Sequence, residues 1–110
     1  MRWVAVAVLT VLLIGCSSPE SIVGERQAYW EKVLASEVPL GSNRATVERW
    51  AGSKSIPLAF IAEKRQLLGS AEFVPVNNWM CKGWSITLEF TLAADGTVSS
   101  EAAKMLGNCL

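Results

Sequence analysis

Residues 84–92 constrain the fold of this 110-residue chain more than any other segment. Apolar residues occupy every second position, and polar residues fill the positions between them, which is typical of a strand with one buried face and one wetted face. Such a strand has to pack against other apolar elements, so it predicts a sheet that is covered on one side. The apolar positions are Trp84, Ile86, Leu88, Phe90 and Leu92.

Two further strands are predicted around this segment. Asp95 and Gly96 follow it and predict a hairpin turn, because glycine tolerates positive φ angles. The return strand is expected to begin with residues 97–102. A strand is also predicted at residues 71–76, where Pro75 is expected near a sheet edge or a strand end because proline cannot donate a ladder hydrogen bond.

A helix is predicted over residues 25–37, which carry an apolar stripe among charged positions. Pro39 ends it, since the residue before a proline is driven toward extended conformations. The preceding residues 16–24 are rich in serine, proline and glycine, so we expect them to form a short loop-like tether. The sequence therefore divides into a leader over residues 1–15, this tether, and one small domain over residues 25–110.

A second helix is predicted to start at a cap, Ser42 or Asn43, and to run to about Ala51, with Gly52 as the residue that follows its end. Residues 54–70 are ambiguous: a short helix or irregular segment is preferred, and a loop with a strand is the alternative. Helices first and antiparallel strands later indicate the α+β class. We expect two N-terminal helices packed on a small antiparallel β-sheet with a C-terminal hairpin.

The first 16 residues resemble a bacterial lipoprotein signal. Arg2 supplies a positive charge, and the apolar run over residues 3–14 is shorter than the ~20 residues of a spanning helix. Leu-Ile-Gly-Cys at residues 13–16 matches the lipobox, which implies cleavage before Cys16 and acylation, with palmitate among the acyl chains. An ordinary secretory signal with a chance cysteine is the alternative. Ser17 follows, where the sorting rule of many Gram-negative bacteria favours the periplasmic face of the outer membrane over the inner membrane.

Cys81 and Cys109 are the two thiols that remain after Cys16 is acylated. An even pair in an exported chain predicts a disulfide, and two free buried thiols are the alternative. With a two-residue hairpin turn, Lys82 rather than Cys81 lies opposite Cys109. A bulge, with Gly83 as the candidate, or a three-residue loop starting at Ala94 would align the two cysteines.

The composition argues against several classes of function. Lys and Arg number ten, as do Asp and Glu, so nothing indicates a basic surface for nucleic acid. The chain has no histidine, the commonest general base, and two distant cysteines supply too few ligands for a metal. We therefore expect no enzymatic activity, no cofactor and no metal. The membrane is expected as a partner through the lipid on Cys16, together with an envelope protein.

A loop between two predicted strands is the candidate contact surface. It contains Asn77, Asn78, Trp79 and Met80, and an aromatic ring beside amides and a methionine suits protein recognition. The alternative is that Trp79 and Met80 fold back to cover the hairpin. The segment near Pro75 is a second candidate, as an edge that accepts a partner strand.

The order of these elements resembles the SmpA/OmlA family of outer-membrane lipoproteins. Gly41, Val47 and Gly52 reproduce the family's spacing around its second helix, and residues 86–90 with residues 95–98 resemble its alternating strand and Asp-Gly turn. This resemblance implies a non-enzymatic structural, assembly or protein-binding module of the bacterial envelope. A periplasmic inhibitor or small-ligand-binding lipoprotein is the alternative function.

Overall fold

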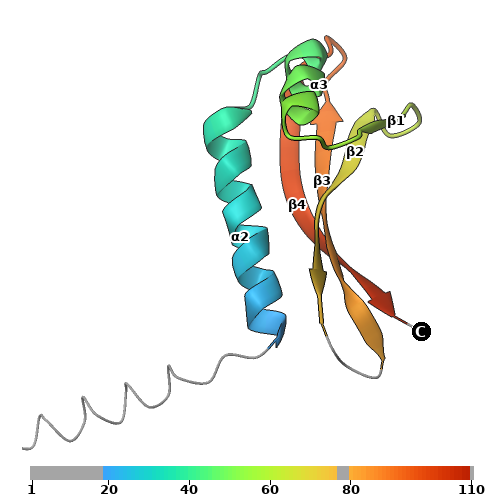
Figure 1. The fold of residues 1–110 in the computed structure, drawn as a ribbon. Coiled ribbons are helices and arrows are strands. Elements are labelled where there is room, and N and C mark those ends of the chain that lie inside the picture. Colours follow the sequence, from blue (N-terminus) through green and yellow to red (C-terminus); the bar gives the residue numbers. More distant parts are fainter. Residues whose placement is uncertain (1–18, 77–79, 110) are drawn as a thin grey trace, which may run out of the picture.

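The computed structural model describes residues 19–76 and 80–109. Within these residues, two helices precede a four-stranded antiparallel sheet whose strands lie side by side in chain order (Figure 1). The predicted α+β class is confirmed. The elements are α2 (Pro19–Glu37), α3 (Arg44–Ser53), β1 (Ala59–Ile61), β2 (Gln66–Pro75), β3 (Cys81–Leu92) and β4 (Val98–Cys109).

Helix α2 begins at Pro19, well before the expected residue 25, so the prediction of a loop up to Gly24 is wrong. Proline suits the first turn of a helix, because its missing N–H has no intrahelical partner there. Val23 is only 1% exposed and joins the core. Burial of this side chain offsets the poor helix propensity of its neighbours Ser21 and Gly24.

Helix α3 is capped as expected at its start and ends differently from the prediction. The Asn43 side chain accepts a 2.8 Å hydrogen bond from the Thr46 N–H. At the other end Gly52 is still helical, and Ser55 takes the positive φ angle, 58°. The Ile56 N–H donates to the Ala51 carbonyl at 2.9 Å, which completes a Schellman motif and buries Ile56.

The predicted helix within residues 54–70 is wrong, and the alternative of a loop with a strand is correct. Strand β1 pairs with the start of β2, and Leu67 of β2 pairs with Phe90 of β3. Leu67 is 1% exposed, so pairing with β3 places it in the core. That long-range contact outweighs the local pattern, which suited a helix equally well. Pro75 is the last residue of β2, at a strand end as expected.

The covered face of the sheet holds the core, with both helices on that face. Trp50 of α3 meets Phe90 edge to face, with ring centroids 6.2 Å apart. From α2, the Gln27 side-chain amide donates to the Ala103 carbonyl of β4 at 2.8 Å. The alternation predicted for residues 84–92 is confirmed, since the inward side chains of β3 from residue 86 onward are buried. The central core residues are Leu34, Val47, Leu67, Ile86, Leu88 and Phe90.

At its turn, the β3–β4 hairpin has a three-residue loop, residues 94–96, rather than a two-residue turn. The Ala93 N–H donates to the Thr97 carbonyl at 2.8 Å, and Gly96 takes a φ angle of 85°. Ser99 is then an extra residue on β4. This bulge shifts the pairing by one residue. Between the bulge and the disulfide end of the hairpin, the strands therefore have the register that a two-residue turn would give.

At its base, the hairpin is closed by the disulfide between Cys81 and Cys109, which confirms the predicted bond. The aligning bulge residue is Lys82, one position before the expected Gly83. Gly83 itself pairs with Asn108, within the regular register. The bulge at Lys82 compensates for the bulge at Ser99, and the two cysteines therefore lie directly opposite each other.

Candidate binding cleft

Most of the site residues expected from the sequence lie outside the described part of the chain. Cys16, Asn77, Asn78 and Trp79 belong to this group. Met80 is described and its side chain is 49% exposed, next to the disulfide. The binding role expected for residues 77–80 therefore stays a prediction.

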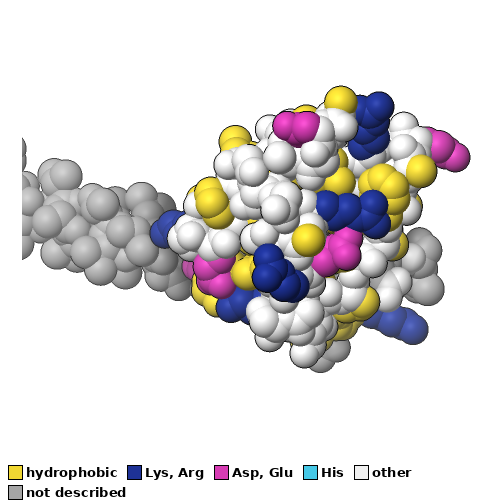
Figure 2. All heavy atoms as spheres, turned by 90° about the horizontal axis from the view of Figure 1, so that it is seen from above, with side chains coloured by type: hydrophobic (Ala, Val, Ile, Leu, Met, Phe, Trp, Pro, Cys, Tyr) yellow, Lys and Arg dark blue, Asp and Glu magenta, His cyan; other side chains and the backbone are white. Residues whose placement is uncertain are grey.

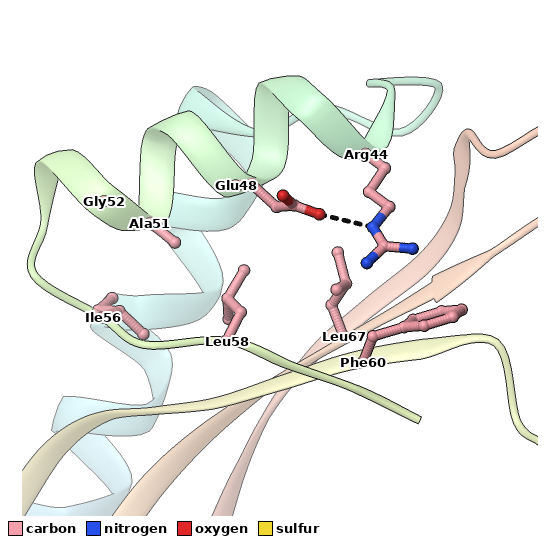
Figure 3. Close-up of a pocket in the computed structure, with 8 residues that line it drawn as sticks. All are labelled: Arg44, Glu48, Ala51, Gly52, Ile56, Leu58, Phe60 and Leu67. Carbon is pink, nitrogen blue, oxygen red and sulfur yellow. Dashed lines mark hydrogen bonds and ion pairs between the residues drawn. The ribbon is translucent and has the colours of Figure 1, made fainter. Parts of the chain in front are cut away.

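The described residues instead form a cleft at the opposite end of the molecule, between α3 and the segment that leads into β1. Seen from this end, charged side chains of both signs lie among apolar ones (Figure 2). Figure 3 shows α3 above the cleft and, below it, the side chains of Ile56, Leu58, Phe60 and Leu67. The cavity volume is about 250 Å³. The lining consists of Arg44, Glu48, Ala51, Gly52, Ile56, Leu58, Phe60 and Leu67.

Arg44 is fixed at one end of this cleft by three contacts. Its backbone N–H donates to the Gly96 carbonyl in the hairpin loop at 3.2 Å. Its Nε donates to the Glu48 carboxylate one turn further along α3. Its guanidinium carbon lies 4.1 Å from the ring centroid of Phe60, in a cation–π arrangement. The terminal nitrogens are thus held over an aromatic surface, where they can reach an anionic group.

The floor of the cleft exists because the chain passes unusually close to β2. A Cβ atom at Gly69 would lie 2.5 Å from the Pro57 carbonyl oxygen and 2.7 Å from a methyl group of Leu58. Only glycine leaves room for this approach. Residues 56–58 can therefore rest on β2, and β1 can place Phe60 beneath Arg44.

The roof of the cleft is held by Glu37 at the end of α2. Its carboxylate accepts hydrogen bonds from Trp50 Nε1 at 3.1 Å and from Lys54 Nζ at 3.2 Å, both of α3. These two hydrogen bonds lower the pKa of Glu37 below its usual range. The contact ties the two helices together and fixes α3 over the floor.

A second hollow adjoins the cleft and shares Arg44 and Phe60 with it. Its volume is about 420 Å³. Arg65 lines it as well, with its carbonyl accepting a 2.8 Å hydrogen bond from the Leu92 N–H. The residues that line this hollow include two arginines, Arg44 and Arg65, and no acidic residue. Guanidinium groups bind carboxylates through paired hydrogen bonds, so the combined surface suits an apolar group with a carboxylate beside it.

The sequence interpretation missed this cleft, because its floor comes from residues 54–70, the stretch left ambiguous. Pro57 and Gly69, which meet at the floor of the cleft, can be seen in the sequence. Their spacing alone does not indicate that the two segments are in contact.

Within the described residues, no group of three or more His, Cys, Asp or Glu side chains is placed to hold a metal ion. None of the helices in residues 19–76 and 80–109 has the length and apolar character needed to cross a membrane. Comparison with protein-family models, with curated proteins and with solved structures finds no match to this chain.

Proposed function

We propose that this chain is a lipoprotein held by Cys16 on the periplasmic face of the outer membrane, where its domain is a non-enzymatic module that binds an envelope protein. The lipobox at residues 13–16 supports the anchor. The resemblance of the helix and strand order to SmpA/OmlA lipoproteins supports an envelope role. The observation that carries the binding role is the pair Arg44 and Phe60, which forms the wall between two adjoining hollows.

A polypeptide segment fits this surface better than a compact ligand does. The two hollows lie side by side and share one wall, so an occupant would have to cross the Arg44–Phe60 pair. The first hollow offers apolar Leu58 and Leu67, and the second offers the guanidinium of Arg65. An extended segment with an apolar side chain, followed by an Asp, a Glu or a chain-terminal carboxylate, places one group in each.

The test compares Phe60→Ala with Tyr29→Ala in the full-length protein, by crosslinking in cells and identification of the captured proteins. The two aromatic side chains are matched: Phe60 is 41% exposed and Tyr29 is 47% exposed, and an arginine lies over each ring. Tyr29 is on α2 and does not line either hollow. We expect Phe60→Ala to weaken capture by ~2 kcal/mol, as the loss of an interface anchor does, and Tyr29→Ala to leave it unchanged.

The identity of the captured protein tests the envelope role separately. The SmpA/OmlA resemblance implies a link to the machinery that assembles β-barrel proteins in the outer membrane, so capture dominated by components of that machinery supports an assembly module. Capture of a hydrolase, or binding of a small molecule to the domain, supports the inhibitor or ligand-binding alternative. Equal loss of capture in the Phe60 and Tyr29 variants, or loss explained entirely by unfolding, contradicts binding at this cleft.

A further inference from the structure

Helix α2 starts at the same end of the molecule as the disulfide. Gln27 of α2 is level with Ala103, which pairs with Leu88 of β3. Pro19 lies about 12 Å before Gln27 along the helix axis. About four residues of a strand span the same length, so Pro19 is level with about Trp84 of β3. Figure 1 agrees, since the first turn of α2 lies beside the lower ends of the strands. The other end of α2 leads to the β3–β4 loop, where the Gly41 N–H donates to the Val98 carbonyl at 2.9 Å.

This arrangement fixes which part of the domain is nearest to the anchor. Cys16 lies three positions before the first residue of α2. Even fully extended, three residues span only about 10 Å. A lipid on Cys16 therefore brings the end of the sheet that carries the disulfide close to the membrane, while the cleft with Arg44 and Phe60 is at the far end.

The sheet residues nearest the anchor have the composition of a surface that contacts lipid. We call this surface the disulfide end and define it as residues 73–76, 80–86 and 105–109. Lys82 is the only charged residue among them, and it is exposed on its bulge. Large apolar side chains are exposed there at Phe73, Met80, Met105 and Leu106, at fractions from 38% to 56%.

The two ends of the molecule therefore differ in chemistry. At the far end, charged side chains of both signs lie among apolar ones (Figure 2). Arg44, Glu48 and Arg65 line the two hollows there. Within the sheet, the disulfide end offers apolar side chains and a single cation. Side chains of this kind, with a lysine beside them, suit the boundary between acyl chains and anionic headgroups.

We propose that the disulfide end lies against the membrane that holds Cys16, with Phe73, Met80 and Leu106 at the lipid interface and the Lys82 ammonium among the phosphates. This inference rests on the lipid anchor of the proposed function. The anchor already confines the domain to the surface, so a small apolar patch is enough to orient it. The strands then lead away from the membrane, and the cleft at the far end faces the periplasm.

The experiment places the photoreactive residue benzoylphenylalanine at position 106 or at position 40 of the full-length protein in native membranes. Leu106 and Leu40 are a matched pair, 56% and 62% exposed, but Leu40 lies at the far end beside Gly41. After illumination, mass spectrometry of the protein detects lipid adducts. We expect severalfold more lipid adducts at position 106 than at position 40.

Equal lipid adducts at the two positions overturn this orientation, and so does a crosslinked dimer as the main product at position 106. Either result leaves the anchor intact if Cys16→Ser releases the protein from the membrane. If Cys16→Ser matches the unaltered protein in both membrane fractionation and gel mobility, the anchor fails and this inference fails with it.

Discussion

The ring of Phe73 covers Gly83 on the neighbouring strand so closely that a Cβ atom at position 83 would lie 2.5 Å from Cζ of the ring. The same Cβ would lie 2.6 Å from the Val74 carbonyl oxygen. On the covered face, Trp84 similarly lies over Gly107, where a Cβ would come 3.1 Å from Cζ3. An aromatic ring over a glycine supplies the side-chain cover that the glycine lacks. These two contacts hold β2, β3 and β4 together near the disulfide.

We predict that Gly83→Ala destabilises the domain by about 1–3 kcal/mol, because the added methyl group overlaps a backbone oxygen as well as a ring. The control is Gly24→Ala in α2, where nothing lies within 4 Å of the new Cβ. That change is expected to stabilise by about 0.5–1 kcal/mol, since alanine favours the helix. Chemical unfolding measures both, and a neutral Gly83→Ala result contradicts the close contact.

The disulfide is expected to contribute about 3.5 kcal/mol to stability, since it joins residues that are 28 positions apart in the chain. Intact mass with alkylation, before and after reduction, tests the bond directly. Unfolding of the variant with Cys81→Ala and Cys109→Ala measures its contribution. Alkylation of both thiols without a reductant would rule the bond out.

Glu72 joins β2 to α2 and is expected to stabilise the domain at neutral pH. Its carboxylate accepts hydrogen bonds from Arg26 Nε at 2.9 Å and from Trp30 Nε1 at 2.9 Å. Burial alone would raise the pKa of Glu72, but these hydrogen bonds and the Arg26 charge lower it overall. A lowered pKa gives stability that is present above the pKa of the unfolded chain and is lost as pH falls through the folded pKa.

The variant Glu72→Gln is therefore expected to lose about 1 kcal/mol at pH 7. The difference from the unaltered protein should shrink as the pH falls below about 4. Unfolding curves over a pH series make this measurement. A difference that does not change with pH would mean that the carboxylate charge at position 72 contributes nothing.

Glu101 is expected to behave in the opposite way. Its Oε2 is buried without a hydrogen-bond partner, and burial raises the pKa of this carboxyl. A raised pKa means that the folded state is penalised as pH rises and the group ionises. We predict that Glu101→Gln stabilises the domain on the order of 1 kcal/mol at pH 7 and that the gain disappears in acid. If Glu101→Gln and Glu72→Gln shift stability in the same direction, this assignment is wrong.

Cys16→Ser tests the anchor itself. Without the thiol there is no acceptor for the acyl chains, so we expect the precursor to remain unprocessed or the protein to leave the membrane fraction. Membrane fractionation and gel mobility are the measurements. An unchanged fractionation and mobility would contradict the lipoprotein interpretation.

The parts of the fold that could be predicted are those with a strong local pattern. The alternation over residues 84–92 identified the central strand and its buried face, and the two candidate caps, Ser42 and Asn43, identified the start of α3, where Asn43 is the cap. The start of α2 could not be predicted, because Val23 is held in the helix by the core rather than by its neighbours. The β1–β2 hairpin depends on pairing with β3, and the cleft depends on that hairpin, so local reasoning missed both.

The bulges also determine where the chain can tolerate a change of length. In the paired strands, Ala71, Lys82 and Ser99 are each an extra residue with no partner opposite. Deleting any one of them leaves every remaining pair in place, including the two cysteines. Deleting a residue between the bulges would turn the rest of that strand over and exchange its buried and exposed side chains. Natural variation in length within this sheet should therefore concentrate at these three positions.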